Sequence, residues 1–126
     1  MPRRILIVDD DFAISATLQE VLQSAGYEVA VASDGLQAIQ QACDAAPDLV
    51  ILDFHMPGGG GTAAYTALRE LGPTRATPVV FLTAVPIAEV KDSVSFGADT
   101  YFIAKPAGLD KLVPLIRKAL KEDAPR

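Results

Sequence analysis

The sequence predicts an α/β fold in which five parallel strands alternate with five helices. Five short runs are rich in apolar and β-branched residues, and four of them are nearly continuous in apolar residues, which is typical of strands buried on both faces. The segments between these runs carry apolar residues at helical spacing, and the connections are short. Strands that alternate with helices in this way form a parallel sheet with right-handed crossovers and helices on both faces.

The five expected strands are four or five residues long, and each is followed by a polar or turn-forming residue. They are Ile5–Val8, Glu28–Ala32, Leu49–Leu52, Val79–Leu82 and Tyr101–Ala104. The expected helices fill the gaps between the strands and the C-terminal part of the chain. They are Phe12–Ala25, a helix capped by Asp34 that runs through Ala45, Thr62–Leu71, Ile87–Phe96 and Leu109–Leu120. This pattern predicts a doubly wound, flavodoxin-like sheet with the strand order 2-1-3-4-5.

The inward faces of the first two helices follow from their apolar spacing. In the first helix this stripe contains Ile14, Leu18, Val21 and Leu22, and Gly26 is a suitable C-cap. In the second helix the inward residues are predicted to be Leu36, Ile39 and Cys43. Cys43 is therefore interpreted as a small packing residue, with a functional thiol as the weaker alternative.

Pro114 conflicts with a regular fifth helix. A proline in a helix interior removes a backbone donor and costs about 3 kcal/mol. We therefore expect either a kink at Pro114 or a helix that starts later than Leu109.

The size and charge of the chain limit its function. With 126 residues, it is long enough for one domain, predicted over residues 1–121, with 122–126 as a tail or the start of a linker. A net charge of −5 argues against direct binding of nucleic acid or an acidic membrane surface. The single cysteine excludes an intramolecular disulfide, and no apolar run is long enough to cross a membrane. We expect a soluble, cytoplasmic protein.

Polar residues follow the ends of four expected strands. They are Asp9, Asp10 and Asp11 after the first strand, Asp53 after the third, Thr83 after the fourth and Lys105 after the fifth. In an open parallel sheet, ligands bind outside the carboxyl ends of the strands where the strand order reverses, which here is between the first and third strands. The sequence therefore predicts a site at this edge.

Crowded carboxylates at this edge indicate a bound cation. Acidic side chains repel each other at close range, and hard cations such as Mg²⁺, or alternatively Mn²⁺, prefer oxygen ligands. The alternative role for these acids is capping of the helix that follows. We assign that role to Asp11, and assign Asp9, Asp10 and Asp53 to the cation.

Four motifs resemble those of response-regulator receiver domains from two-component signalling. They are ILIVDDD, LDFHMPGGGG, FLTA and AKP. The resemblance extends from Ile5 to Leu120. It implies a switch that is not an enzyme beyond self-catalysed phosphorylation and dephosphorylation.

The resemblance also implies a role for each site residue. Asp53 would accept a phosphoryl group from a histidine kinase or a histidine phosphotransfer protein. Asp10 would bind Mg²⁺ directly, Asp9 through water, and His55 through its backbone carbonyl. Thr83 and Lys105 would bind the phosphoryl oxygens. The side chain of His55 is interpreted either as a modulator of dephosphorylation or as a solvated loop residue.

The resemblance implies a conformational switch as well. Thr83 would move toward the phosphoryl group and vacate space for an aromatic residue of the fifth strand. Counting back from Lys105 gives Phe102, whereas counting forward from the preceding glycine gives Tyr101, because this segment has eight steps where the family usually has seven. We favour Phe102. A downstream protein would then bind the face formed by the fourth helix, the fifth strand and the fifth helix.

Other functions remain as alternatives. A phosphorylation-independent interaction module on the same fold is the main one. An aspartyl-phosphate phosphatase is disfavoured because His55 replaces its second acid, and a dinucleotide protein is disfavoured because no GxGxxG follows the first strand.

Four consecutive glycines, residues 58–61, follow the predicted acceptor. They lack the Gly-Lys-Ser/Thr ending of a nucleotide-binding loop. The resemblance places the start of the third helix at Gly61. Because glycine runs are costly to order, Gly58, Gly59 and Gly60 are predicted to form a mobile loop.

Overall fold

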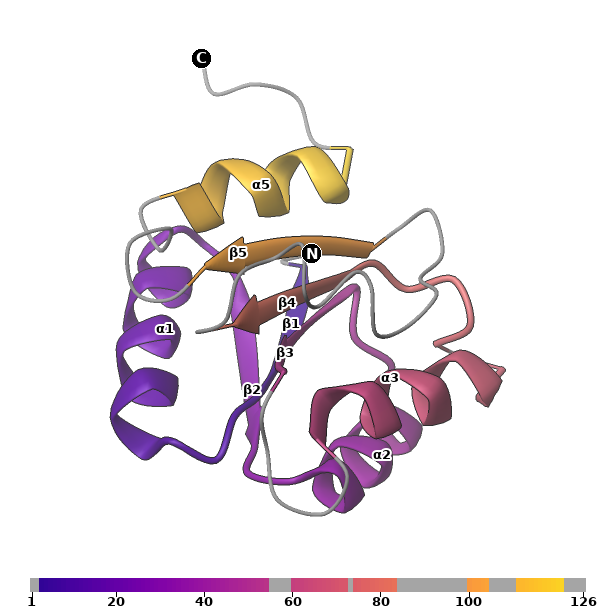
Figure 1. The fold of residues 1–126 in the computed structure, drawn as a ribbon. Coiled ribbons are helices and arrows are strands. Elements are labelled where there is room, and N and C mark those ends of the chain that lie inside the picture. The colour runs from indigo at the N-terminus through magenta and orange to yellow at the C-terminus, as the bar shows by residue number, and fades with distance from the viewer. Residues whose placement is uncertain (1–2, 55–59, 73, 84–99, 105–110, 122–126) are drawn as a thin grey trace.

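The computed structural model has the predicted α/β architecture. It describes residues 3–54, 60–72, 74–83, 100–104 and 111–121. Five strands form one parallel sheet in the order β2-β1-β3-β4-β5. Figure 1 shows this sheet with helices on both sides. The predicted fold class and strand order are therefore confirmed.

Each strand begins and ends within one residue of its predicted position. The strands are β1 (Arg4–Val8), β2 (Glu28–Ala32), β3 (Leu49–Asp53), β4 (Val79–Thr83) and β5 (Thr100–Ala104). The helices in the described part of the chain are α1 (Phe12–Ser24), α2 (Gly35–Asp44), α3 (Gly60–Glu70) and α5 (Leu112–Ala119). The helix predicted over Ile87–Phe96 and the tail predicted over 122–126 lie outside the described residues.

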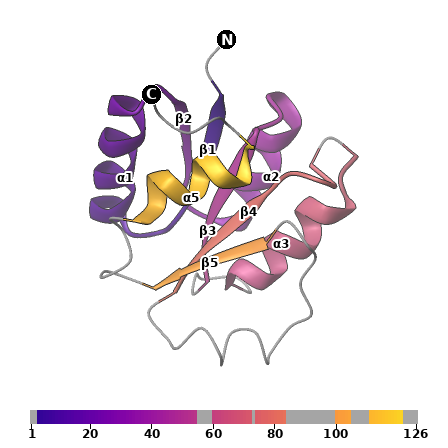
Figure 2. The same ribbon diagram turned by 90° about the horizontal axis from the view of Figure 1, so that it is seen from above.

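Two layers of helices cover the sheet. α1 and α5 cover one face, and α2 and α3 cover the other (Figures 1 and 2). Along β1, Ile5 and Ile7 face the α1/α5 side, while Leu6 and Val8 face the α2/α3 side. Every residue of β3 and β4 is buried. Burial on both faces explains why these strands are apolar runs without alternation.

The ends of α1 are set by local chemistry. The Asp11 carboxylate accepts hydrogen bonds from the backbone N–H groups of Ala13 at 2.9 Å and Ile14 at 3.2 Å. This confirms Asp11 as the N-cap. Past the other end, Gly26 has a φ of +97°, a conformation that favours glycine and turns the chain toward β2.

The prediction that Val21 faces the core was wrong. Its side chain is 43% exposed, whereas Ser15, Leu18 and Leu22 are the buried residues of α1. At about 100° per residue, Val21 lies roughly a quarter-turn away from the line through those three residues.

The predicted inward face of α2 was wrong at Leu36 and Cys43, whereas Ile39 is half-buried. Leu36 is 67% exposed and Cys43 is exposed, while Ala38 and Ala42 are buried. The helix presents small residues because it packs closely: a Cβ added to Gly35 would lie 3.8 Å from the Cβ of Ala64 on α3. A stripe of large side chains would hold α2 away from its neighbours.

Helix α3 begins earlier than predicted. The expected start was Gly61 or Thr62, with Gly60 in a loop, but the helix includes Gly60. Glycine costs about 1 kcal/mol in a helix. Burial of Ala64, Tyr65 and Leu68 in the following turns offsets that cost. Gly58 and Gly59 lie outside the described residues.

Helix α5 resolves the conflict at Pro114. Lys111 is the N-cap residue and the helix starts at Leu112, so Pro114 lies in the first turn. The first four N–H groups of a helix have no partner within the helix, so proline removes no hydrogen bond there. The late start is the alternative that holds. None of the described helices is long and apolar enough to cross a membrane.

Candidate functional site: an acidic cluster beside a buried threonine

The candidate site lies at the carboxyl ends of the three central strands. Asp9 follows β1, Asp53 is the last residue of β3, and Thr83 is the last residue of β4. Val8 pairs with Leu52 in the β1–β3 register, which brings the residues that follow each of them to the same edge. Residues far apart in the chain therefore meet here because of the strand order.

Three carboxylates converge at this edge. One carboxylate oxygen from each of Asp9, Asp10 and Asp53 lies within 4.8 Å of the other two. Asp9 is 1% exposed and Asp53 is 6% exposed, while Asp10 is exposed. Three negative charges this close repel one another, and the repulsion is strong where water is largely excluded. A donor set made of carboxylate oxygens fits Mg²⁺ or a similar hard cation.

Backbone contacts fix the position of Asp9. Its carboxylate accepts a hydrogen bond from the N–H of Asp11 at 2.8 Å, and its own N–H donates to the carbonyl of Ala32 at 3.1 Å. On α1, the buried Ser15 donates its hydroxyl to the Asp9 carbonyl at 3.4 Å. Hydrogen bonds to Ala32 of β2 and from Ser15 of α1 thus fix the turn between β1 and α1. The bond from the Asp11 N–H orients one carboxylate oxygen of Asp9.

Thr83 is fully buried at the end of β4. Between Asp53 and this strand end, the N–H of Phe54 donates to the carbonyl of Leu82 at 2.8 Å. Thr83 shares the face of β4 that carries Phe81, because side chains alternate along a strand. That face points to the α2/α3 side of the sheet.

Phe102 and Tyr101 lie on opposite faces of β5. Phe102 pairs in register with Phe81, and their rings stack with centroids 5.6 Å apart and planes at 14°. Tyr101 pairs with Val80 and packs against the α1/α5 core. Of the two candidates for the switch, Phe102 is therefore the one on the face of Thr83.

Two predicted site residues cannot be placed. His55 and Lys105 lie outside the described residues. An aromatic cluster on the same face of the sheet as Thr83, in which Phe54 and Tyr65 both contact Phe81, was not predicted. The alternation of β4 places Phe81 on the face of Thr83, but no sequence pattern indicates which residue of α3 covers it.

Comparisons with known proteins agree with this geometry. Residues 5–117 match the family described as "Response regulator receiver domain". Response regulator MprA of Mycobacterium sp. (strain KMS) is 36% identical over 126 residues, which cover 99% of this chain and 54% of that protein. Transcriptional regulatory protein PrrA of Mycobacterium tuberculosis is 38% identical over 121 residues, which cover 94% of this chain and 50% of that protein. The chain thus spans about half the length of these curated relatives.

Solved structures give the same result. The chemotaxis protein CheY4 of Vibrio cholerae superposes with a TM-score of 0.84 at 29% identity, covering 94% of this chain and 99% of that one. The response regulator TrrA of Thermotoga maritima, solved in complex with Mg²⁺-BeF, gives a TM-score of 0.80 at 33% identity, covering 93% of this chain and 98% of that one. Fold, acidic site and sequence agree, and this chain belongs to the response regulator receiver domain family.

Proposed function

We propose that Asp53 accepts a phosphoryl group from a phosphohistidine on a partner kinase or phosphotransfer protein. The observation that supports this most is the meeting of Asp9, Asp10 and Asp53 within 4.8 Å, although Asp53 lies far from the other two in the chain. Such a cluster provides a carboxylate nucleophile and, beside it, oxygen ligands for a cation.

The transfer requires little covalent chemistry from the protein. A carboxylate oxygen of Asp53 attacks the phosphorus, a P–O bond forms, and the P–N bond to the donor histidine breaks with its electron pair left on nitrogen. The ionised form of Asp53 is the nucleophile. Positioning and charge neutralisation then account for most of the catalysis, as in other phosphoryl transfers.

Mg²⁺ is the cation we assign to the site. When bound, it would neutralise the charge shared by the carboxylates and the transferred phosphoryl oxygens. Asp10 and the backbone carbonyl of His55 would hold it directly, and Asp9 would hold it through water. The Mg²⁺-BeF complex of the Thermotoga protein supports this assignment. Thr83 and Lys105 would bind the remaining phosphoryl oxygens.

Phosphorylation would then act on β5. An aspartyl phosphate adds about two negative charges and strong acceptor oxygens. We propose that Thr83 turns toward them and that Phe102 responds, because both lie on the same face of the sheet. A downstream protein would read the change on the surface that includes β5 and α5.

The output is proposed to run through protein contacts. The relative PrrA is named a transcriptional regulatory protein, and it is about twice as long as this chain. Any binding to DNA would belong to a longer protein of that kind rather than to this acidic domain. We propose that this phosphoryl transfer takes place in the cytoplasm, where Cys43 would remain reduced.

Intact mass spectrometry tests the proposal. The protein is incubated with acetyl phosphate and Mg²⁺ and then weighed. We expect a gain of one phosphoryl mass in the wild type and in Asp34→Asn, a control that changes an acid at the N-cap of α2. Asp53→Asn should gain none. No gain in the wild type would reject phosphoryl acceptance and favour a phosphorylation-independent interaction module.

A further inference from the structure

Tyr65 of α3 reaches β5. Its hydroxyl lies 2.9 Å from the hydroxyl of Thr100, the first residue of that strand, and either oxygen can donate. The Tyr65 side chain is only 6% exposed. A hydrogen bond between two side chains in such a place joins α3 to an edge strand that is otherwise paired only with β4 in the described sheet.

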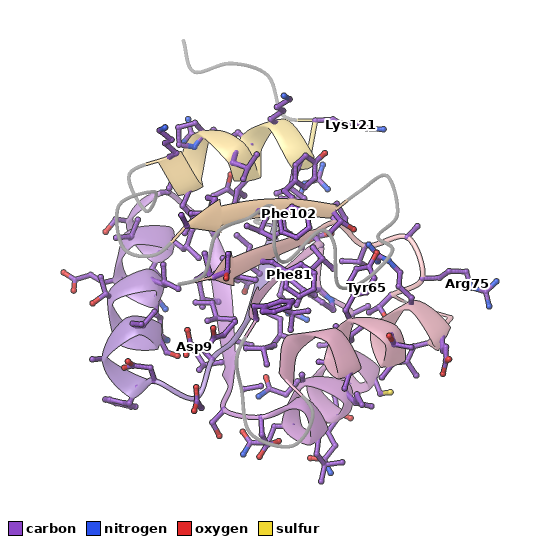
Figure 3. The ribbon with its side chains drawn as sticks, in the orientation of Figure 1. Asp9, Tyr65, Arg75, Phe81, Phe102 and Lys121 are labelled. Atoms are coloured by element: carbon purple, nitrogen blue, oxygen red, sulfur yellow. The ribbon has the colours of Figure 1, made fainter. Side chains whose placement is uncertain are left out.

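The same tyrosine belongs to the aromatic cluster under Phe102. The rings of Tyr65 and Phe81 are 5.5 Å apart and tilted by 47°, and Phe81 stacks on Phe102. Figure 3 shows these three side chains gathered between β5 and α3. Thr100 and Phe102 are two residues apart on one strand and therefore share this face. Tyr65 thus contacts two neighbours of Phe102: its ring packs against Phe81, and its hydroxyl bonds to Thr100.

Arg69 holds Tyr65 from the helix side. Its guanidinium lies 4.9 Å from the centre of the Tyr65 ring, a cation–π contact. The same guanidinium donates to the carbonyls of Thr74, at 3.2 Å, and Thr77, at 2.5 Å, in the segment before β4. Tyr65 is therefore fixed to α3 and to the connection between α3 and β4, and it can act as an anchor for β5.

The cluster also adjoins the acceptor. Phe54 follows Asp53 directly, and its ring meets Phe81 edge-on at 5.9 Å and 72°. A shift at the end of β3 would therefore change the packing of Phe81, the ring that both Tyr65 and Phe102 contact. Dense packing transmits such shifts because the interior contains few voids.

We propose that Tyr65 is a positioning residue for Phe102. Its hydrogen bond to Thr100 connects β5 to α3 and keeps Phe102 stacked on Phe81 in the unphosphorylated protein. Tyr65 thereby sets the resting position of the residue that we assign to the switch. This rests on the proposed function only in giving Phe102 that role. A neutral hydrogen bond of this kind changes an equilibrium by about threefold to tenfold.

Fluorine NMR tests the proposal in the unphosphorylated protein. The chain has five phenylalanines, so labelling with 3-fluorophenylalanine gives a simple spectrum. The Phe102 resonance is assigned with Phe102→Leu. Thr100→Val removes one hydroxyl of the pair at nearly constant shape, and Tyr65→Phe removes the other while adding one resonance.

We expect the Phe102 resonance to move toward that of a solvated ring in both variants, with the stacked state disfavoured about threefold to tenfold. The double variant should match the single ones, because either change breaks the same bond. Thr17→Val, which removes a hydroxyl on α1 that bonds within its own helix, should leave the resonance unchanged. The proposal is overturned if Phe102 keeps its wild-type resonance in both Thr100→Val and Tyr65→Phe.

A purely structural role is separated by thermal unfolding, which is measured on every variant. A lower melting temperature with an unmoved Phe102 resonance also rejects the positioning role. These spectra use no phosphoryl donor. If Asp53 gains no phosphoryl mass, the proposed function fails, whereas the fastening of Phe102 by Tyr65 is decided by the spectra alone.

Discussion

At the scale of single residues, two neighbours in the acidic cluster differ in their surroundings. Asp9 is almost fully buried and its carboxylate accepts the N–H of Asp11, while Asp10 is exposed. The buried carboxylate is held by the chain, and the exposed one is more accessible to a cation. This difference supports direct coordination by Asp10 and an indirect role for Asp9.

The first prediction concerns Asp10. Asp10→Asn removes a carboxylate that we propose as a direct ligand, and it should weaken Mg²⁺ binding by about tenfold or more, measured by isothermal titration calorimetry. Asp34→Asn makes the same change at the same edge of the sheet but outside the cluster. It should keep the affinity within about twofold, because Asp34 is not one of the clustered carboxylates and salt screens charges that lie farther away. Equal effects of the two substitutions would reject a specific cation site.

The meeting of Asp9, Asp53 and Thr83 at one edge of the sheet could be predicted for a simple reason. In a parallel sheet all strands end at one edge, so Asp9, Asp53 and Thr83 could be brought together from the order of the strands alone. The contact of Tyr65 with Phe81 and Thr100 could not be predicted. It depends on how α3 crosses the sheet, which is set by packing rather than by any local pattern.

At the scale of elements, strands were predicted better than helix faces. The central strands β1, β3 and β4 are buried runs whose ends are marked by polar residues, so their bounds follow from the sequence. The face of helix α2 was predicted wrongly because its buried residues, Ala38 and Ala42, are small while the large side chain of Leu36 is exposed. Apolar spacing identifies a buried face only where the large residues lie on it.

Helix α5 gives the second prediction. Because Pro114 lies in the first turn, Pro114→Ala should change the free energy of unfolding by less than about 1 kcal/mol. Urea denaturation measures this difference. In a helix interior the same substitution would remove a penalty of about 3 kcal/mol. A stabilisation of that size would show that the helix begins well before Leu112.

At the scale of the whole molecule, the site joins segments from both halves of the chain. Asp9 and Asp10 come from the connection between β1 and α1, Asp53 from the end of β3, and Thr83 from the end of β4. A ligand that binds them together favours the folded state, because the unfolded chain holds no such site. Binding at the acidic cluster should therefore be visible as stability of the entire domain.

The third prediction follows from this linkage. Mg²⁺ with beryllofluoride at about 100 times the dissociation constant should raise the free energy of unfolding by about 2.7 kcal/mol. For a domain of this size the melting temperature should rise by several degrees, measured by calorimetry. Asp53→Asn should abolish the rise. An equal rise in that variant would place the bound ligand elsewhere.

The position of the phosphoryl group is the central claim, and chemical trapping tests it most directly. Protein phosphorylated with acetyl phosphate and Mg²⁺ is reduced with borohydride, which converts an aspartyl phosphate to homoserine, and is then digested for peptide mass mapping. We predict homoserine at residue 53 and at no other aspartate. Homoserine at Asp9 or Asp10, or a modified protein in which Asp53 stays intact, would contradict the account.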